Sequence, residues 1–327
     1  MLSSIKPSSF LFALAACALS MLANGGARAA YPERIIKIVV PFAPGGGTDV
    51  VARTLAQEMA KDLGVSVIVE NKPGAGTIIG TQSVATSEGD GYTLLMGTFA
   101  NAVNPSLYAK LPYDQHRDLA AVALIARSFS IVVVNPKSAI QSVKDLIAAA
   151  KAEPDKLSYG TYGTGTSAHL AGELFKHMAG VNLTTVPYKG SAPAITDLIG
   201  GQIQVMFTTV ASAASLVEGG QLRALAVTSA ERSPAFPNLP TVAEAGVPGY
   251  DAEAWYGLFA PAKTPPEIID RLNKAAAVAV KADAFKKLSV NEGLVMAASP
   301  PAELDHYFRE EEDRWRKVIQ DAGIKAD

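Results

Sequence analysis

The chain has 327 residues, of which 49% are apolar and 18% are charged, and its formal net charge is −2. This length suits about two domains, and the composition excludes disordered and fibrous proteins. A net charge so close to zero gives no long-range attraction for nucleic acid. If the protein binds an anion, a local arrangement of donors must attract it.

The first 29 residues are predicted to be a secretory leader. Lys6 provides a positive start, "FLFALAACALSMLA" is an apolar core, and Ala27–Ala29 offers small residues at a cleavage site. The only cysteine, Cys17, lies inside this leader, so the exported part has no thiol chemistry. A second interpretation stays open, because "LAAC" at Leu14–Cys17 resembles a lipoprotein processing box that would make Cys17 a lipid-bearing N-terminus.

Strand-like and helix-like segments alternate along most of the remaining chain. Short apolar strands between helices indicate parallel sheets that are covered on both faces. Ligands of such sheets bind at the carboxyl ends of the strands. We predict strands at 35–42, 65–72, 92–98, 130–136, 157–162, 182–188, 203–209 and 222–229, with helices at 49–64, 77–87, 142–154, 167–180, 194–202 and 210–220.

Two long, largely non-helical stretches interrupt this alternation, at 119–136 and 222–261. They suit a chain that leaves one lobe, builds a second and returns. We predict a first lobe from 30–130 and 231–327 and a second lobe from 131–230. The tail is predicted to be helical and to pack on the first lobe, with its charged run "REEEDRWRKV" as a solvated face.

Three glycine loops are candidates for holding an anion: the first at Gly45–Asp49, the second at Gly163–Ser167 and the third at Gly74–Thr77. Glycine lets the backbone turn tightly and approach a ligand. A helix that begins just afterwards presents free N–H groups and the positive end of its dipole. Two such loops, one from each lobe, could grip an anion between them.

Nucleotide sites fit these loops poorly. No glycine is followed by Lys and then Ser or Thr, as a phosphate-binding loop requires. Gly163–Ala168 matches the loose dinucleotide pattern, but Tyr188 and Lys189 stand about where that site needs an acidic residue.

Catalytic and metal sites find little support either. There is no G-x-S-x-G motif, and His169 and Glu173 have metal-ligand spacing without a third ligand nearby. Asp49 is either a first-turn acid that stabilises a helix or a residue that shapes the loop around a ligand. Trp255 and Tyr256 are either core aromatics or part of a pocket wall. We expect no metal and no cofactor.

The whole chain after the leader resembles the extracytoplasmic substrate-binding proteins of tripartite tricarboxylate transporters, the Bug family. The segments that carry the resemblance include "IVVPFAPGGGTDVVAR", "ENKPGAGTIIGTQSVATSEGDGYTLL", "YGTYGTGTSAHLAGELF" and "VPYKGSAPAITDLIGGQIQVMF". The resemblance implies an α/β periplasmic binding fold of the type II kind, with two lobes, parallel-rich sheets and two crossing strands. It also implies a periplasmic monomer that closes over a small carboxylate and delivers it to membrane permease subunits.

Carried over to this sequence, the resemblance places the ligand between two groups of residues, the first from the first glycine loop and the second from the second lobe. The first group is Phe42, Gly46, Gly47, Thr48 and Asp49. The second group is Thr164, Gly165, Thr166 and Ser167, bordered by Tyr188 and Lys189.

One departure from the family bears on the ligand. Many relatives have an acid directly after "MF", where this chain has Thr208. A neutral threonine would leave a buried ammonium unpaired, which is costly. We therefore expect an aliphatic or aromatic carboxylic acid without an amine. A sensory binding protein that docks on a membrane receptor and, with less support, an exported hydrolase or isomerase are the alternatives.

Overall fold

The computed structural model describes residues 31–233, 236–292, 294–321 and 323–324. The predicted leader and Cys17 lie outside the described residues. All elements named below belong to the compact unit that begins at Arg34. Within the described ranges, none of the helices combines the length and the apolar character needed to span a bilayer.

The strands form a mixed sheet whose main path runs β2-β1-β3-β9-β4-β7-β5-β6, while β8 and β10 both pair with β4. The α/β fold predicted from the alternating pattern is therefore confirmed. The strands are β1 (Ile36–Val40), β2 (Val67–Asn71), β3 (Thr93–Thr98), β4 (Leu119–Val134), β5 (Ser158–Thr161), β6 (Thr184–Pro187), β7 (Val205–Thr209), β8 (Arg223–Val227), β9 (Glu253–Pro261) and β10 (Leu294–Met296).

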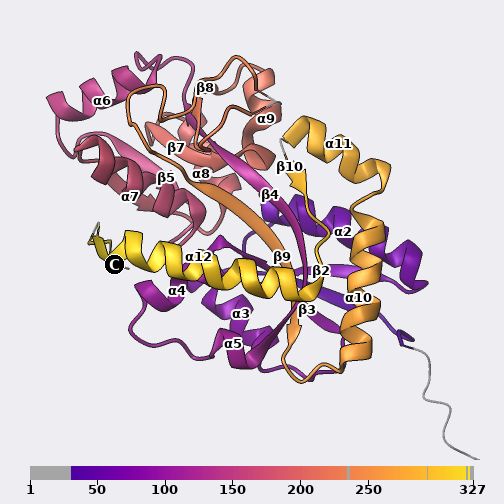
Figure 1. Cartoon of the computed structure of the whole chain (residues 1–327). Helices are drawn as coiled ribbons and strands as arrows, with labels where there is room; N and C mark the ends of the chain where they lie inside the picture. Colours follow the sequence, from indigo (N-terminus) through magenta and orange to yellow (C-terminus); the bar gives the residue numbers. More distant parts are fainter. Residues whose placement is uncertain (1–30, 234–235, 293, 322, 325–327) are drawn as a thin grey trace, which may run out of the picture. The chain divides into compact units, whose positions relative to one another are not determined.

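Parallel pairing is confined to the two outer parts of the sheet. Strand β1 is parallel to β2 and β3, and β5 is parallel to β6 and β7. The pairs made by β4 and β9 at the centre are antiparallel (Figure 1). The sheet is therefore mixed, because these two long strands run back across the molecule without the crossover helix that parallel neighbours need.

Strand β4 serves both parts of the sheet. Its segment Leu119–Phe129 pairs with β9, and Ser130–Val134 pairs with β7 and β8. We call β1, β2, β3, β9 and β10 the first half of the sheet and β5 to β8 the second half. The change of partner falls between Phe129 and Ser130, close to the predicted lobe boundary, which stays a prediction.

Most helices follow the predicted segments, but two do not. Helices α4 and α5 occupy a region between strands where we predicted none, and Pro105 inside α4 masks its helical pattern. The helices are α2 (Gly47–Leu63), η1 (Ala75–Thr77), α3 (Ile78–Ala85), α4 (Phe99–Leu107), α5 (Gln115–Asp118), α6 (Val143–Ala152), α7 (Ser167–Ala179), α8 (Ser191–Ile199), α9 (Val210–Glu218), α10 (Pro266–Ala279), α11 (Asp283–Glu292) and α12 (Pro301–Asp321).

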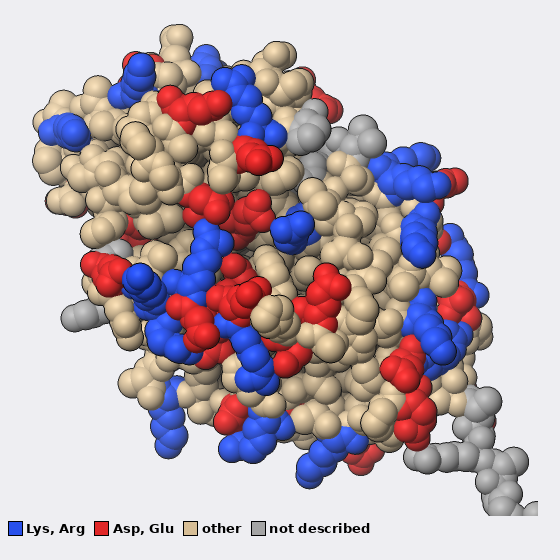
Figure 2. Space-filling view, in the orientation of Figure 1, with Lys and Arg blue, Asp and Glu red and all other residues tan. Residues whose placement is uncertain are grey.

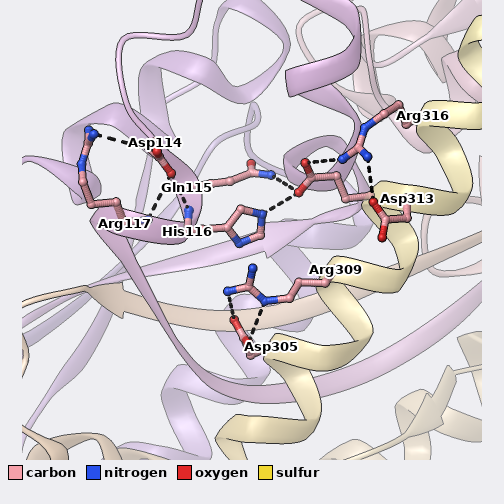
Figure 3. Close-up of polar contacts among 9 residues, drawn as sticks. Asp114, Gln115, His116, Arg117, Asp305, Arg309, Asp313 and Arg316 are labelled. Atoms are coloured by element: carbon pink, nitrogen blue, oxygen red, sulfur yellow. Dashed lines mark hydrogen bonds and ion pairs between the residues drawn. The ribbon is translucent and has the colours of Figure 1, made fainter.

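Helix α12 packs one face on α4 and β4 and turns the other to solvent (Figure 1). Leu304, Phe308, Trp315 and Ile319 recur at helical spacing on the buried face. On the surface, acidic and basic side chains are interspersed over the region that α12 crosses (Figure 2). The prediction of a solvated charged face is only partly right, because Glu312 is buried, and it contacts His116 of α5 beside the ion pairs in Figure 3.

Candidate functional site

A small cavity, here called the inner cavity, lies between the two halves of the sheet. Its volume is about 30 Å³, room for about two water molecules. None of the described residues that line it is Asp, Glu, Lys, Arg or His. They are Phe42, Gly46, Gly47, Thr48, Thr98, Phe99, Tyr162, Thr166, Ser167, Ser191, Thr209, Ser212, Ala254, Trp255 and Tyr256.

Five helices begin at this cavity. Helices α2, α4, α7 and α8 start at lining residues, and α9 starts directly after the lining residue Thr209. The first N–H groups of a helix have no partner within the helix, and its dipole makes this end positive. The inner cavity therefore gathers hydrogen-bond donors and partial positive charge without a basic side chain, which suits an anion.

The first glycine loop is shaped by Asp49, which is almost fully buried. Its carboxylate accepts hydrogen bonds from the Gly45 N–H at 3.0 Å, Arg53 Nε at 2.8 Å and Asn71 Nδ2 at 2.9 Å. Burial alone would raise the pKa of Asp49, but these hydrogen bonds and the charge of Arg53 outweigh it and lower the pKa. Asp49 thus holds the loop from behind and is not among the residues that line the inner cavity.

The second loop is closed by Thr166, the N-cap of α7. Its hydroxyl donates to the Gly163 carbonyl at 2.8 Å and accepts from the His169 N–H at 3.4 Å. The hydroxyl is therefore engaged within the loop, and the backbone N–H of Ser167, the first residue of α7, is a candidate donor because it has no partner within the helix. His169 packs behind the loop, where its Nδ1 accepts from the Gly165 N–H at 3.2 Å. Within the described part of the chain, no cluster of three potential metal ligands is found.

A group of hydroxyls from the second half, which the sequence analysis missed, completes the inner cavity. Ser212 Oγ accepts from the Gly47 N–H at 3.1 Å and lies 2.9 Å from Thr209 Oγ1. It also donates to Ser191 Oγ at 3.2 Å. The available signal was the same one that marked the glycine loops, since Ser191 and Thr209 each stand where a helix begins.

Thr208 lies behind Tyr162 and does not line the inner cavity. The Tyr162 hydroxyl donates to Thr208 Oγ1 at 2.5 Å and accepts from the Thr209 N–H at 2.8 Å. Burial raises the pKa of Tyr162 to about 12, so this hydroxyl stays protonated at neutral pH. Thr208 thus fixes the ring of Tyr162, which does line the cavity.

A second cavity, here called the aromatic chamber, has a volume of about 400 Å³ and shares Phe42 and Tyr162 with the inner cavity. The third glycine loop lines this chamber and not the inner cavity. Its lining residues are Pro41, Phe42, Gly74, Ala75, Gly76, Thr77, Tyr108, Tyr162, Gly163, Thr164, Pro187, Tyr188 and Lys189.

The structure therefore divides the predicted ligand-binding residues among three places. Phe42, Gly46, Gly47, Thr48, Thr166 and Ser167 line the inner cavity. Phe42, Thr164, Tyr188 and Lys189 line the aromatic chamber. Asp49, Gly165 and Thr208 line neither cavity.

The residues of the first half and those of the second half, here called the two sides of the site, contact one another directly. The Ala43 N–H donates to the Lys189 carbonyl at 3.1 Å, besides the bond from Gly47 to Ser212. At Gly76 the approach is so close that an added Cβ would meet the Thr164 carbonyl oxygen at 2.4 Å. Glycine at this position lets the third glycine loop contact the second loop.

The fold is that of periplasmic binding proteins, and comparisons with known proteins give the family. The sequence model of the family described as the tripartite tricarboxylate transporter family receptor matches residues 51–324 of this chain. The chain therefore belongs to this family. Protein BugT of Bordetella pertussis is 38% identical over 297 residues, which cover 90% of this chain and 91% of BugT.

Two solved structures share the fold. The periplasmic binding protein BugD is 35% identical with a TM-score of 0.87, over 90% of this chain and 99% of the BugD chain. The structure of Rpa4515 of R. palustris with adipate is 38% identical with a TM-score of 0.87, over 90% of this chain and 99% of that chain. The α/β fold of this chain, with its mixed sheet, is thus that of periplasmic binding proteins.

Proposed function

We propose that the protein is a periplasmic receptor that captures a small carboxylate and delivers it to the membrane subunits of a tripartite tricarboxylate-type transporter. One observation carries the proposal: five helices begin at a cavity that is lined by no acidic side chain of the described residues. Membership of the receptor family supports delivery to a transporter, and the adipate in the Rpa4515 structure supports a carboxylate ligand.

Uncharged donors in this cavity can hold a carboxylate without a basic residue. Hydrogen bonds to a charged group are stronger than neutral ones, and an enclosed site strengthens them further. Trp255, which lines the cavity, also has a buried indole N–H with no hydrogen-bond partner among the described residues.

Capture requires the two sides of the cavity to separate. A volume of about 30 Å³ is too small for an acid such as adipate. Polar contacts join the sides, for example those from Gly47 to Ser212 and from Ala43 to Lys189. A ligand that bridges the sides replaces these contacts and shifts the equilibrium toward a closed, loaded form.

The ligand is expected to have no cationic amine. An ammonium group buried beside Tyr162 would have neither Asp nor Glu among the described lining residues as its partner. Thr208, which stands where many relatives have an acid, offers only a hydroxyl that already bonds to Tyr162. Leaving a buried charge unpaired is costly, so amino acids should bind poorly.

Isothermal titration calorimetry with adipate, terephthalate, benzoate, citrate, aspartate and glutamate tests this function. We expect at least one of the acids without an amine to bind in the micromolar range or tighter and to be recovered unaltered by mass spectrometry. Tight binding of an amino acid alone, or turnover of a bound acid by pure protein, contradicts the proposal. Deletion of the gene should abolish uptake of the acid that binds, and unchanged uptake contradicts the delivery step.

A further inference from the structure

The aromatic chamber adjoins the inner cavity through two rings. Phe42 follows β1 of the first half, Tyr162 follows β5 of the second half, and both line both cavities. Because the two rings come from opposite sides of the site, separation of the sides also separates the rings. A ligand whose acid group lies in the inner cavity can then extend between the rings into the chamber.

The lining of the chamber is unlike that of the inner cavity. Four aromatic residues line it, and the only basic residue among its described lining residues is the exposed Lys189. Hydrogen bonds fix the outer ends of two of the tyrosines: the Tyr162 hydroxyl bonds to Thr208, and the Tyr188 hydroxyl donates to Asp197 Oδ2 at 2.7 Å. Rings held at their hydroxyls present fixed apolar surfaces, which favour a flat aromatic partner.

The third glycine loop, which lines the chamber, has an unusual backbone. Four consecutive residues have positive φ: Gly74 at 134°, Ala75 at 47°, Gly76 at 59° and Thr77 at 83°. The buried Asn104 holds them, since its Nδ2 donates to the Gly76 carbonyl at 3.1 Å and to Thr77 Oγ1 at 3.2 Å. Positive φ is unfavourable for alanine and more so for the β-branched threonine, and such strained backbone clusters at ligand-binding sites.

We infer that the aromatic chamber is the subsite for an aromatic ring that carries a second acid group. The first carboxylate of the ligand lies in the inner cavity, the ring lies among Phe42, Tyr162 and Tyr108, and the second carboxylate meets Lys189 at the rim. The chamber volume of about 400 Å³ accommodates a substituted benzene ring, which the inner cavity does not. This inference rests on the proposed capture of a carboxylate.

Calorimetric titration of the full protein with terephthalate, benzoate and adipate tests the inference, because these acids differ in the ring and in the second carboxylate. Terephthalate is expected to bind about tenfold more tightly than adipate.

Tyr108→Leu should reduce terephthalate affinity about fivefold with little effect on adipate, whereas Tyr108→Phe, which keeps the ring, should preserve the ratio. Lys189→Met should reduce terephthalate affinity about fivefold and leave benzoate unchanged. Lys151→Met, which removes an exposed lysine of α6, is the matched control and should change neither.

The outcomes separate this inference from the proposed function. Adipate binding as tightly as terephthalate overturns the inference and leaves the proposed function standing. An equal effect of Lys189→Met and Lys151→Met on terephthalate also overturns it. Binding of none of the three acids contradicts the proposed capture of a carboxylate, and the inference then fails with it.

Discussion

The ring of Phe99, which lines the inner cavity, meets the indole of Trp315 edge to face, with 4.7 Å between the ring centroids and 89° between the ring planes. Phe99 is the first residue of α4, and Trp315 lies on α12. A second wall residue, Trp255, packs in the same way on Phe308 of α12 at 5.8 Å. The C-terminal helix therefore supports the cavity wall from behind, although it contributes no lining residue.

Replacement of Trp315 should affect both stability and binding. Trp315 is 1% exposed, so Trp315→Ala leaves a large internal space and should lower the free energy of unfolding by about 3–5 kcal/mol. Ligand affinity should also fall, because Phe99 loses its support. Trp315→Phe retains an aromatic contact and should be milder in both respects. Denaturant unfolding measures the stability and calorimetry measures the affinity. An unchanged affinity of folded Trp315→Ala would show that α12 does not influence ligand binding.

Much of the fold was predictable because its signals are local. The apolar run of β1 and the glycines before α2 are adjacent in sequence, so strand, loop and helix start could be recognised together. The contact between Gly47 and Ser212 could not be predicted, because the two residues are 165 positions apart in sequence and only the sheet topology brings them together. Thr166 was predicted to lie at the ligand, and only the structure shows that Gly163 and His169 already engage its hydroxyl.

The close contact at Gly76 can be tested against a matched glycine. Gly76 and Gly64 both have positive φ, 59° and 72°, but an added Cβ at Gly64 meets no atom within 4 Å. Gly64→Ala should therefore lower stability by about 1–2 kcal/mol and leave ligand affinity unchanged. Gly76→Ala carries the same backbone cost and also clashes with Thr164, so its affinity should fall roughly tenfold. Equal affinities of the two variants would show that the two loops need not meet in the loaded form.

Thr166, the N-cap of α7, can be tested with two variants, one that removes its hydroxyl and one that keeps it. Thr166→Ala removes the hydroxyl that bonds to Gly163 and His169 and should lower the free energy of unfolding by about 1 kcal/mol. Affinity should fall as well, because the loop that presents the Ser167 N–H is loosened. Thr166→Ser keeps the hydroxyl and should restore both quantities in thermal melts and titrations. Failure of serine to restore binding would point to the threonine methyl group as the important part.

Asp49→Asn should change how stability depends on pH. The folded pKa of Asp49 lies below its ordinary value of 3.8, so the carboxylate contributes stability that is complete above about pH 4 and is lost as the pH falls further. At pH 7 the variant should be less stable by about 1–3 kcal/mol, since Arg53 loses its charged partner. The difference between wild type and variant should shrink as the pH is lowered toward 3 in urea unfolding. A difference that is constant with pH would mean that the charge of Asp49 does not hold the loop.

Glu312 gives an independent pH-dependent contact, between α12 and α5, beside the ion pairs of Figure 3. Its carboxylate lies 2.6 Å from His116 Nε2 and accepts from Gln115 Nε2 at 3.0 Å and Arg316 at 3.0 Å. Burial alone would raise the pKa of Glu312, but these contacts outweigh burial, so the pKa lies below its ordinary value of 4.5. The stability that the carboxylate contributes is complete above about pH 4.5 and is lost on acidification below it.

Glu312→Gln should therefore lower the free energy of unfolding by about 1–3 kcal/mol at pH 6 and by less at pH 3.5. Ligand affinity at pH 6 should stay close to that of wild type, because Glu312 lies outside the residues that line either cavity. Glu310→Gln, which alters an exposed acid two positions away, is the matched control and should shift stability by less than about 0.5 kcal/mol. A loss at Glu310 as large as that at Glu312 would mean that the general charge of α12, and not its contact with α5, stabilises the helix.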